Sequence, residues 1–277
     1  MWHDAGMSSV PFHHPDLSVT VLRRRASEFL LDLLAYYGEA AVTRGRSLLW
    51  SDCFSSRRAY EGAVWRLRKK GSVSISRGKD GRRLLRVAPG HEESAALRPD
   101  RYWKRRWDGW WRVLVYDIPE DERSFRNGLR KFLARLRMGY LQHSVWISPW
   151  DIRPDYADLQ TSLNLESVSF LFEARTVLGR TSSDLVLEAW GFEQLADAQR
   201  DYLAASGAYL RDLRDIGLTR EQLSAVARQE MMHYLHAMAA DPLLPKILIP
   251  AGYQGFRVFE QHCRVSERVQ HWLKVLE

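Results

Sequence analysis

The 277-residue sequence has only two cysteines, Cys53 and Cys263, and neither belongs to a Cys-X-X-Cys pair. A disulfide framework or a structural zinc site needs thiols at short, paired spacing, so we expect both to be ordinary thiols. The sequence also lacks an apolar run of the roughly 18 residues that a membrane span requires. Its N-terminus has neither the charged start nor the apolar stretch of a signal peptide. These absences predict a cytoplasmic protein.

Motifs of the common enzyme classes are missing as well. The sequence contains no Walker loop and no GxGxxG, GxSxG or HExxH pattern, so it predicts no cofactor. No third ligand is in view for His13 and His14, which lie in the expected tail, and no Cys or carboxylate partner is suggested for His233 and His236. We therefore expect solvation or packing of these histidines, and no metal site.

Positive charge is concentrated at the front of the chain. Residues 1–110 hold 21 Lys and Arg against 12 Asp and Glu, whereas residues 111–277 hold 20 against 22. This asymmetry favours a polyanionic partner for the first part, and nucleic acid over a membrane surface because no basic amphipathic anchor is present. The alternative is a solvated basic face without a partner.

The basic region has the element order of a winged helix-turn-helix. After a disordered tail, the expected elements are a helix over 19–37, a short helix over 48–54, a basic helix from Ser55 or Ser56 to Lys70, and a hairpin of 73–76 and 84–87. Serine suits the N-cap of the basic helix, and Gly71 suits its C-terminal stop. The Gly78-to-Gly81 segment suits the turn of the hairpin.

Exposed side chains of this module predict DNA contacts. A helix fits the major groove, and Arg57, Arg58 and Glu61 lie on the turns that reach base edges. Trp65 projects from the same side as a bulky groove residue. Cations at the helix end and on the hairpin are expected to neutralise phosphates, namely Arg68, Lys69, Arg77, Lys79, Arg82 and Arg83. Glu61 could instead form an ion pair with Arg58. The alternative for the whole module is a protein-binding surface or a solvated basic face.

The middle of the chain predicts a β-α-β core. A strand without charge over 113–116 precedes an amphipathic helix in which Phe125, Leu129, Phe132, Leu133 and Leu136 recur at steps of three and four. A return strand follows, because Leu141, His143, Val145 and Ile147 alternate with polar residues and Trp146. A helix over 155–163 and a strand over 167–174 complete this region. For the aromatic lead-in before it, we favour packing over base or adenine stacking.

Three separated blocks carry a resemblance to a known family. WDGWWRVLVYDIPE, GYLQHSVWISP and ADPLLPKILIP resemble the signature blocks of the PaaX-like transcription regulators, and the likeness runs from about Leu22 to Val269. The middle block also resembles the small CRISPR adaptation nucleases, which are ferredoxin-like. The chain differs from the family pattern at the short segment over 48–54 and at Glu61 and Trp65.

The resemblance implies an α+β fold with five parts. These are a tail over 1–17, a winged helix-turn-helix over 18–90, a linker over 91–100, a ferredoxin-like dimerisation domain over 101–185, and a helical domain over 186–277. It also implies a homodimer and an acyl-CoA thioester effector sensed by the last domain. Four residues there and nearby have suitable chemistry for such a ligand: Arg175, Arg180, Trp190 and Tyr234.

Asp117 supports a competing hypothesis. In the CRISPR relatives an Asp at this position is associated with a divalent metal and phosphodiester cleavage. An Asp-Ile-Pro junction is also typical of a strand end, and we favour that structural role. The sequence therefore predicts a dimeric regulator of double-stranded DNA, most simply a repressor released by a metabolite. The alternatives are a metal-dependent nuclease centred on Asp117 and a noncatalytic protein-interaction module.

Overall fold

The structure is a computed structural model of the whole chain. It describes residues 30–31, 34, 40–43, 46–47, 56–77, 83–88, 95–119, 122–157, 168–214 and 218–275. The chain forms two compact units. The first comprises residues 1–94, 210–231 and 266–277, and the second comprises residues 95–209 and 232–265.

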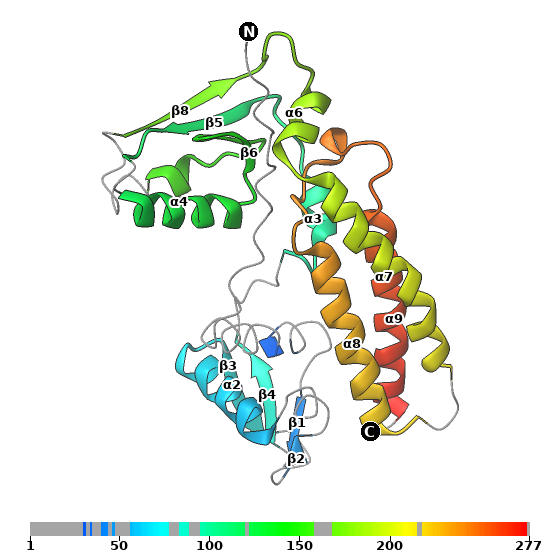
Figure 1. The fold of residues 1–277 in the computed structure, drawn as a ribbon. Coiled ribbons are helices and arrows are strands. Elements are labelled where there is room, and N and C mark those ends of the chain that lie inside the picture. The colour runs from blue at the N-terminus through cyan, green and yellow to red at the C-terminus, as the bar shows by residue number, and fades with distance from the viewer. Residues whose placement is uncertain are drawn as a thin grey trace. The chain divides into compact units, whose positions relative to one another are not determined.

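The first unit contains the predicted basic helix and hairpin. The helix is α2 (Arg57–Lys69), and the strands are β3 (Val73–Arg77) and β4 (Arg83–Val87). Two short strands that we did not predict, β1 (Ala40–Thr43) and β2 (Arg46–Ser47), extend the hairpin into an antiparallel sheet of order β2-β1-β4-β3 (Figure 1). The pairing of Ile75 with Leu85 sets the register of the hairpin. Helix and hairpin thus follow the sequence pattern.

The second unit is built on a four-stranded antiparallel sheet of order β6-β7-β5-β8. Its elements are β5 (Trp111–Tyr116), α4 (Arg123–Arg135), β6 (Gly139–Gln142), β7 (Val145–Ser148) and β8 (Ser169–Ala174). The inner strands β7 and β5 pair with each other, and the outer strands β6 and β8 pair with β7 and β5. α4 carries the chain from β5 past the position of β7 to β6. This connectivity is the ferredoxin-like arrangement that the resemblance implied.

One expectation about this sheet was wrong. The predicted single return strand is a hairpin, because the chain turns at His143 and Ser144 between β6 and β7. His143 has a positive φ of 40°, a backbone conformation that the alternation of side chains does not reveal. β8 is consequently the fourth strand of the domain and not the third. The first strand also begins earlier than predicted and includes the charged Arg112.

The two faces of the sheet pack differently. On one face, Leu129 and Leu133 of α4 are buried against Leu114 and Trp146, as the helical stripe predicted. Figure 1 shows α4 beside the sheet. On the other face, Trp111 packs with side chains of α6 (Ser182–Ala189). The packing of Trp111 agrees with the structural role that we favoured for the aromatic lead-in.

The outer strand β8 keeps two large apolar side chains in contact with solvent. Phe170 and Phe172 are 64% and 53% exposed, and their rings stack with centroids 6.1 Å apart. They lie opposite Val115 and Val113 of β5, on the face away from α4. In the part of the sheet that the structure describes, β8 pairs only with β5, so its other edge has no partner strand.

The C-terminal region is helical, as expected. The helices are α6, α7 (Phe192–Asp212), α8 (Arg220–Met238) and α9 (Gly255–Val275). A short α3 (Pro99–Trp103) and a 3-10 turn η3 (Lys246–Leu248) complete the described elements. Thr219 and Gln222 cap each other's backbone at the start of α8. None of the described helices has the length and apolarity that crossing a bilayer demands.

Several predictions lie wholly or partly outside the described residues. Residues 30, 31 and 34 of the predicted first helix are helical and buried, but the rest of that helix is not described. The tail with its histidines, the short helix over 48–54 with Cys53, and the turn over 78–81 are also outside. Of the predicted helix over 155–163, only residues 155–157 are described, and they are helical.

Candidate nucleic-acid interface

The helix α2 is held in place by its cap and its apolar side. Ser56 is the N-cap, and its hydroxyl accepts a hydrogen bond of 3.2 Å from the backbone N–H of Ala59. Tyr60, Ala63 and Leu67 are buried at spacings of three and four. The opposite side of the helix is therefore turned to solvent.

Six exposed side chains lie on that solvent side, and we call them the exposed stripe. They are Arg57, Arg58, Glu61, Trp65, Arg68 and Lys69. The first turn of α2 contains no acidic residue, and the last turn carries three cations. The structure thus places on one face of one helix all six residues of α2 that the sequence predicted as DNA contacts.

Glu61 is paired inside this stripe. Its Oε1 accepts a 2.8 Å bond from Nε of Arg57, one helical turn earlier, and both side chains are largely exposed. The sequence left open a pair with Arg58; in the structure the partner is Arg57. An exposed pair of this kind is weak, so water or a base edge can displace it at little cost.

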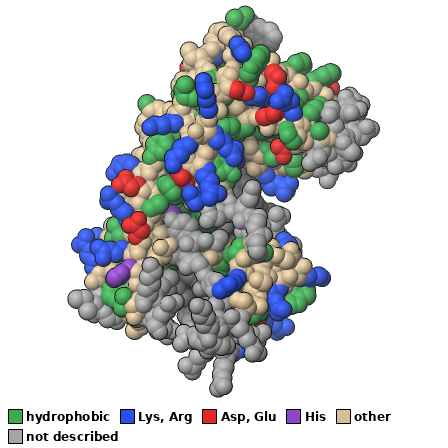
Figure 2. Space-filling view, turned by 180° about the vertical axis from the view of Figure 1, so that it is seen from behind, with side chains coloured by type: hydrophobic (Ala, Val, Ile, Leu, Met, Phe, Trp, Pro, Cys, Tyr) green, Lys and Arg blue, Asp and Glu red, His purple; other side chains and the backbone are tan. Residues whose placement is uncertain are grey.

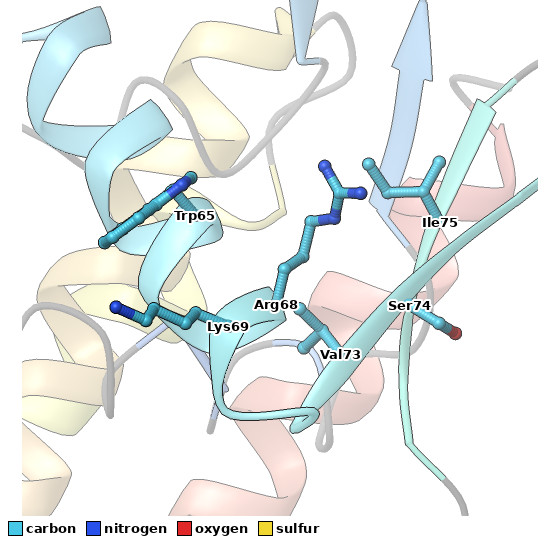
Figure 3. Close-up of a pocket in the computed structure, with 6 residues that line it drawn as sticks. All are labelled: Trp65, Arg68, Lys69, Val73, Ser74 and Ile75. Carbon is cyan, nitrogen blue, oxygen red and sulfur yellow. The ribbon is translucent and has the colours of Figure 1, made fainter.

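Trp65 lies beside a shallow hollow between α2 and β3 (Figure 3). The hollow is lined by Trp65, Arg68, Lys69, Val73, Ser74 and Ile75. The ammonium of Lys69 lies 5.2 Å from the centre of the Trp65 ring, a cation–π contact. Arg68 extends toward Ile75 on the strand side. The hollow therefore combines an apolar lining with a cationic rim.

The hairpin supplies further cations, of which the sequence prediction missed one. Arg77 and Arg83 face each other in the register of β3 and β4, but their side chains, like all of Lys79 and Arg82, are outside the described residues. Arg86 is exposed and lies opposite Ser74 in the hairpin, next to the hollow. Its position within the strand, with Leu85 buried before it, was a signal for an outward cation.

Asp117 is exposed just after β5, and its backbone N–H donates to the carbonyl of Val168 at 2.7 Å. This bond ties the strand end to the start of β8. Glu120 and Asp121 are outside the described residues. Among the described side chains, no three of His, Cys, Asp or Glu come together as metal ligands.

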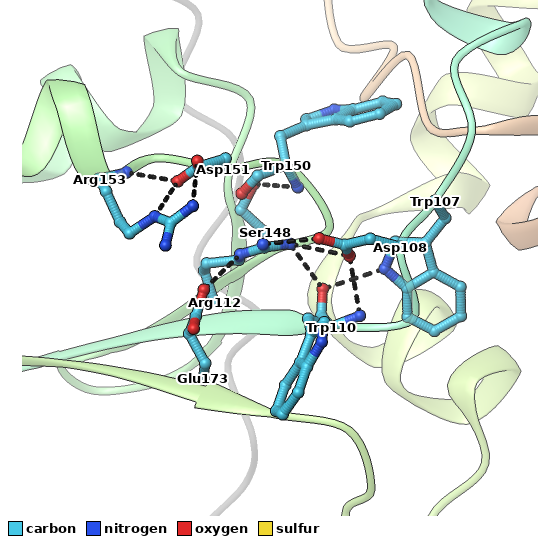
Figure 4. A network of polar contacts seen from close by, with 9 residues as sticks. All are labelled: Trp107, Asp108, Trp110, Arg112, Ser148, Trp150, Asp151, Arg153 and Glu173. Carbon is cyan, nitrogen blue, oxygen red and sulfur yellow. Dashed lines mark hydrogen bonds and ion pairs between the residues drawn. The ribbon is translucent and has the colours of Figure 1, made fainter.

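A charged network that the sequence did not predict surrounds Arg112 (Figure 4). Its guanidinium donates to both carboxylate oxygens of Asp108, at 2.9 and 2.6 Å, and to Glu173 at 3.1 Å. The Arg112 side chain is 5% exposed, against 49% for Asp108 and 38% for Glu173. The hydrogen bonds from Arg112 hold the pKa of the Asp108 carboxyl below its usual range. This network joins the lead-in to the sheet, with Gly109 at a φ of +82° allowing the intervening turn.

A second carboxylate, Asp241, is buried in the block ADPLLPKILIP. Its side chain accepts from the backbone of Leu243 at 2.8 Å, from the Tyr253 hydroxyl, and from Gln199 at 3.3 Å. Its backbone carbonyl accepts from Arg137. Burial raises the pKa of Asp241, and these donors oppose that rise. This site was not predicted from the sequence; its partners Gln199 and Arg137 are 42 and 104 positions away in the chain.

The four candidate effector residues occupy different surroundings. Tyr234 is fully buried, with its hydroxyl donating to the Ala96 carbonyl at 2.6 Å. Trp190 is also buried, and its indole N–H donates to the carbonyl of Arg137 at 3.1 Å. Arg175 is exposed over the ring of Trp110, and exposed Arg180 lies 3.7 Å from Glu188. The structure thus gives each candidate a local partner of its own.

Many of the described cations outside α2 lie close to acidic side chains. Figure 2 shows Lys and Arg side chains interspersed with Asp and Glu over the visible face. Arg153, for example, donates to both oxygens of Asp151 at 2.8 and 2.7 Å. His233, on α8, bonds the Tyr209 hydroxyl at 3.1 Å, which fits the packing role we expected for it. Two helices are exceptions: α2 has one carboxylate among five cations, and α4 has five cations and no carboxylate.

Known proteins resemble this chain most clearly in its central domain. The family described as PaaX protein central Cas2-like domain matches residues 104–186, which include the whole four-stranded sheet. This central domain belongs to the PaaX family. Transcriptional repressor PaaX of Escherichia coli (strain K12) is 26% identical over 224 residues, covering 75% of this chain and 67% of that protein. The relation of the chain as a whole to PaaX is therefore distant.

A solved structure shares the fold. The uncharacterized protein Rv0674 from Mycobacterium tuberculosis superposes with a TM-score of 0.56 at 21% identity, covering 87% of this chain and 94% of that protein. At this identity the likeness concerns the fold alone. It extends well beyond the PaaX-family central domain, since that domain is less than a third of the chain.

Proposed function

We propose that this PaaX-family chain is a DNA-binding transcriptional repressor whose residues 18–90 form a winged helix-turn-helix. The exposed stripe of α2, next to the β3–β4 hairpin, is the observation that carries the proposal. In this assignment α2 enters the major groove, with Arg57 and Arg58 donating to base acceptors and Glu61 accepting from cytosine. The repressor role is supported by the distant relation to Escherichia coli PaaX.

Phosphate contacts would come from the far end of the helix and from the hairpin. Arg68, Lys69 and Arg86 are exposed on the described part of this surface. Lys79 and Arg82 are assigned to the same role from their place in the sequence. Such contacts position the protein without reading the base sequence, and they make binding strongly dependent on salt.

We assign the ferredoxin-like domain, residues 101–185, to dimerisation. One edge of β8 has no partner strand in the described part of the chain, and Phe170 and Phe172 are exposed beside it. This supports the assignment, because a second copy would cover apolar surface and pair with that edge. A twofold dimer presents two recognition helices to two half-sites. Light scattering after size-exclusion chromatography tests it: Phe172→Lys is expected to shift the protein from dimer to monomer.

The effector is proposed to be an acyl-CoA thioester that acts on residues 186–277. Arg175 and Arg180 are exposed and suit its phosphates, whereas Trp190 and Tyr234 are buried in the state described. A ligand that reached the buried pair would have to bind a rearranged conformation, and so would shift the population away from the DNA-binding state. Acyl-CoA compounds are therefore expected to lower DNA affinity in the assay below.

The decisive experiment is fluorescence anisotropy of the purified protein with duplex DNA from upstream of its own gene, at two salt concentrations and against scrambled competitor. We expect sequence preference that Arg58→Ala abolishes. Arg257→Ala, which removes an exposed cation from α9, is the matched control and should bind like the wild type. Preference retained by Arg58→Ala would contradict the assignment of α2.

Parallel samples with magnesium and manganese test the alternative centred on Asp117. Cleavage that Asp117→Ala removes would replace the repressor proposal with a nuclease. Absence of binding to any duplex, with every variant folded, would instead indicate a protein-interaction module on this fold.

A further inference from the structure

Trp65 is the one member of the exposed stripe without charge. Its side chain is 60% exposed, although burying a tryptophan is among the most favourable steps in folding. An exposed aromatic side chain on a binding face indicates an apolar group on the partner. The question is which apolar group the proposed partner, duplex DNA, offers at that position.

The helix geometry places Trp65 on the groove side of α2. It follows Glu61 by four residues and Arg57 by eight, so the three side chains lie on one face, about 12 Å from first to last. The ammonium of Lys69 lies 5.2 Å from the ring centre. Figure 3 shows the neighbouring Arg68 extended toward β3. The indole thus lies on the same helix face as two cations, which suits a surface where phosphates flank the base edges.

Base edges in the major groove carry almost only hydrogen-bond donors and acceptors. The exception is the 5-methyl group of thymine, which is the one apolar group that a side chain on the groove face can meet there. The indole of Trp65 has one N–H donor but mainly apolar surface, and the nearby lining contributes Val73 and Ile75. The tryptophan side chain also extends farther from the helix toward a base edge than a serine or alanine at the same position would.

We propose that Trp65 packs on the 5-methyl group of a thymine and thereby sets base preference at one position of each half-site. Lys69 and Arg68 hold the phosphates flanking that nucleotide. This inference rests on the proposed DNA-binding function and adds to it a specificity-determining residue together with the base that it selects.

The test uses 2′-deoxyuridine, which differs from thymidine only by lacking that methyl group. A duplex enriched from a random-sequence library by the wild-type protein is resynthesised with each thymine replaced in turn. Loss of one buried methyl is expected to weaken wild-type binding by roughly fourfold at one position per half-site. Trp65→Ala should bind the thymine duplex more weakly and show no thymine-to-uracil difference at that position.

Lys69→Ala is the matched control. It should weaken binding to both duplexes equally, lower the salt dependence by about one counterion, and leave the methyl effect intact. Trp65→Phe, which keeps a smaller aromatic ring, should retain part of the effect. Circular dichroism checks that each variant is folded, as expected for an exposed position.

The outcomes separate this inference from the proposed function. Equal wild-type affinity for every thymine and uracil duplex would overturn the role of Trp65 while leaving DNA binding intact. A methyl effect that persists in Trp65→Ala would assign it to another residue and overturn the inference as well. Failure to enrich any duplex would overturn both this inference and the proposed function.

Discussion

The network at Arg112 predicts that removing its acidic partners is more harmful than removing the cation. Arg112 is 5% exposed, whereas Asp108 and Glu173 are 49% and 38% exposed. A buried guanidinium that loses its carboxylates has little water to replace them, and the loss of a fully buried partner typically costs about 3–5 kcal/mol. Half-exposed carboxylates that lose the cation are solvated instead.

We therefore compare two variants that remove charge from opposite sides of the network. Asp108→Asn combined with Glu173→Gln leaves Arg112 without a charged partner, and we expect it to lower the free energy of unfolding by about 2–3 kcal/mol, since the exposure of this edge lets some water in. Arg112→Met keeps most of the volume of the side chain and is expected to cost on the order of 1 kcal/mol.

Urea unfolding followed by tryptophan fluorescence measures both, because Trp107, Trp110 and Trp150 lie at the network (Figure 4). Arg153→Met, which removes an exposed arginine that bonds Asp151, serves as the control and should lower the midpoint only slightly, because an exposed ion pair contributes roughly 0–1 kcal/mol. The reasoning is refuted if Arg112→Met destabilises the protein as much as the double replacement of the carboxylates.

Three further predictions concern the second unit. Gly139→Ala should destabilise the protein by about 1–3 kcal/mol in thermal unfolding, because a methyl group there would lie 2.6 Å from the neighbouring Ala189 Cβ. Tyr253→Phe removes a donor from the buried Asp241 carboxylate and should cost about 1–3 kcal/mol in the same assay. Hydrogen bonds from its neighbouring arginine lower the pKa of Asp151 to about 2. The ionised Asp151 therefore contributes to the stability of the fold at neutral pH, and this contribution is lost as the pH falls from about 4 to about 2. A carboxyl NMR titration checks this range.

Local signals in the sequence predicted the elements that local chemistry controls. The serine cap and apolar spacing of α2, and the stripe of Leu129 and Leu133 in α4, are set by neighbours within one or two turns. The return strand was mispredicted because the alternation of side chains continues through His143, where no Gly or Pro marks the turn. Periodicity alone does not distinguish a long strand from a tight hairpin.

The charged networks could not be predicted from the sequence for a different reason. Arg112 meets Glu173 across 61 positions of sequence, and Arg137 meets the carbonyl of Asp241 across 104. Nothing near either residue indicates its partner. The exposed stripe, in contrast, depends on one helix and its periodicity, and all six of its members were predicted.

Gly139 bears on how a mutational scan of this protein would be interpreted. A Cβ there would lie 2.6 Å from the Ala189 side chain and 2.8 Å from the Trp190 ring. The close approach of α6 to β6 therefore requires a residue without a side chain at position 139. A saturation scan scored by reporter output would find the position intolerant of every replacement. Such intolerance would look like that of a ligand contact, although it records how closely a helix approaches a strand. Scans of PaaX-family domains therefore need an abundance readout beside the activity readout before a sensitive position is assigned to binding.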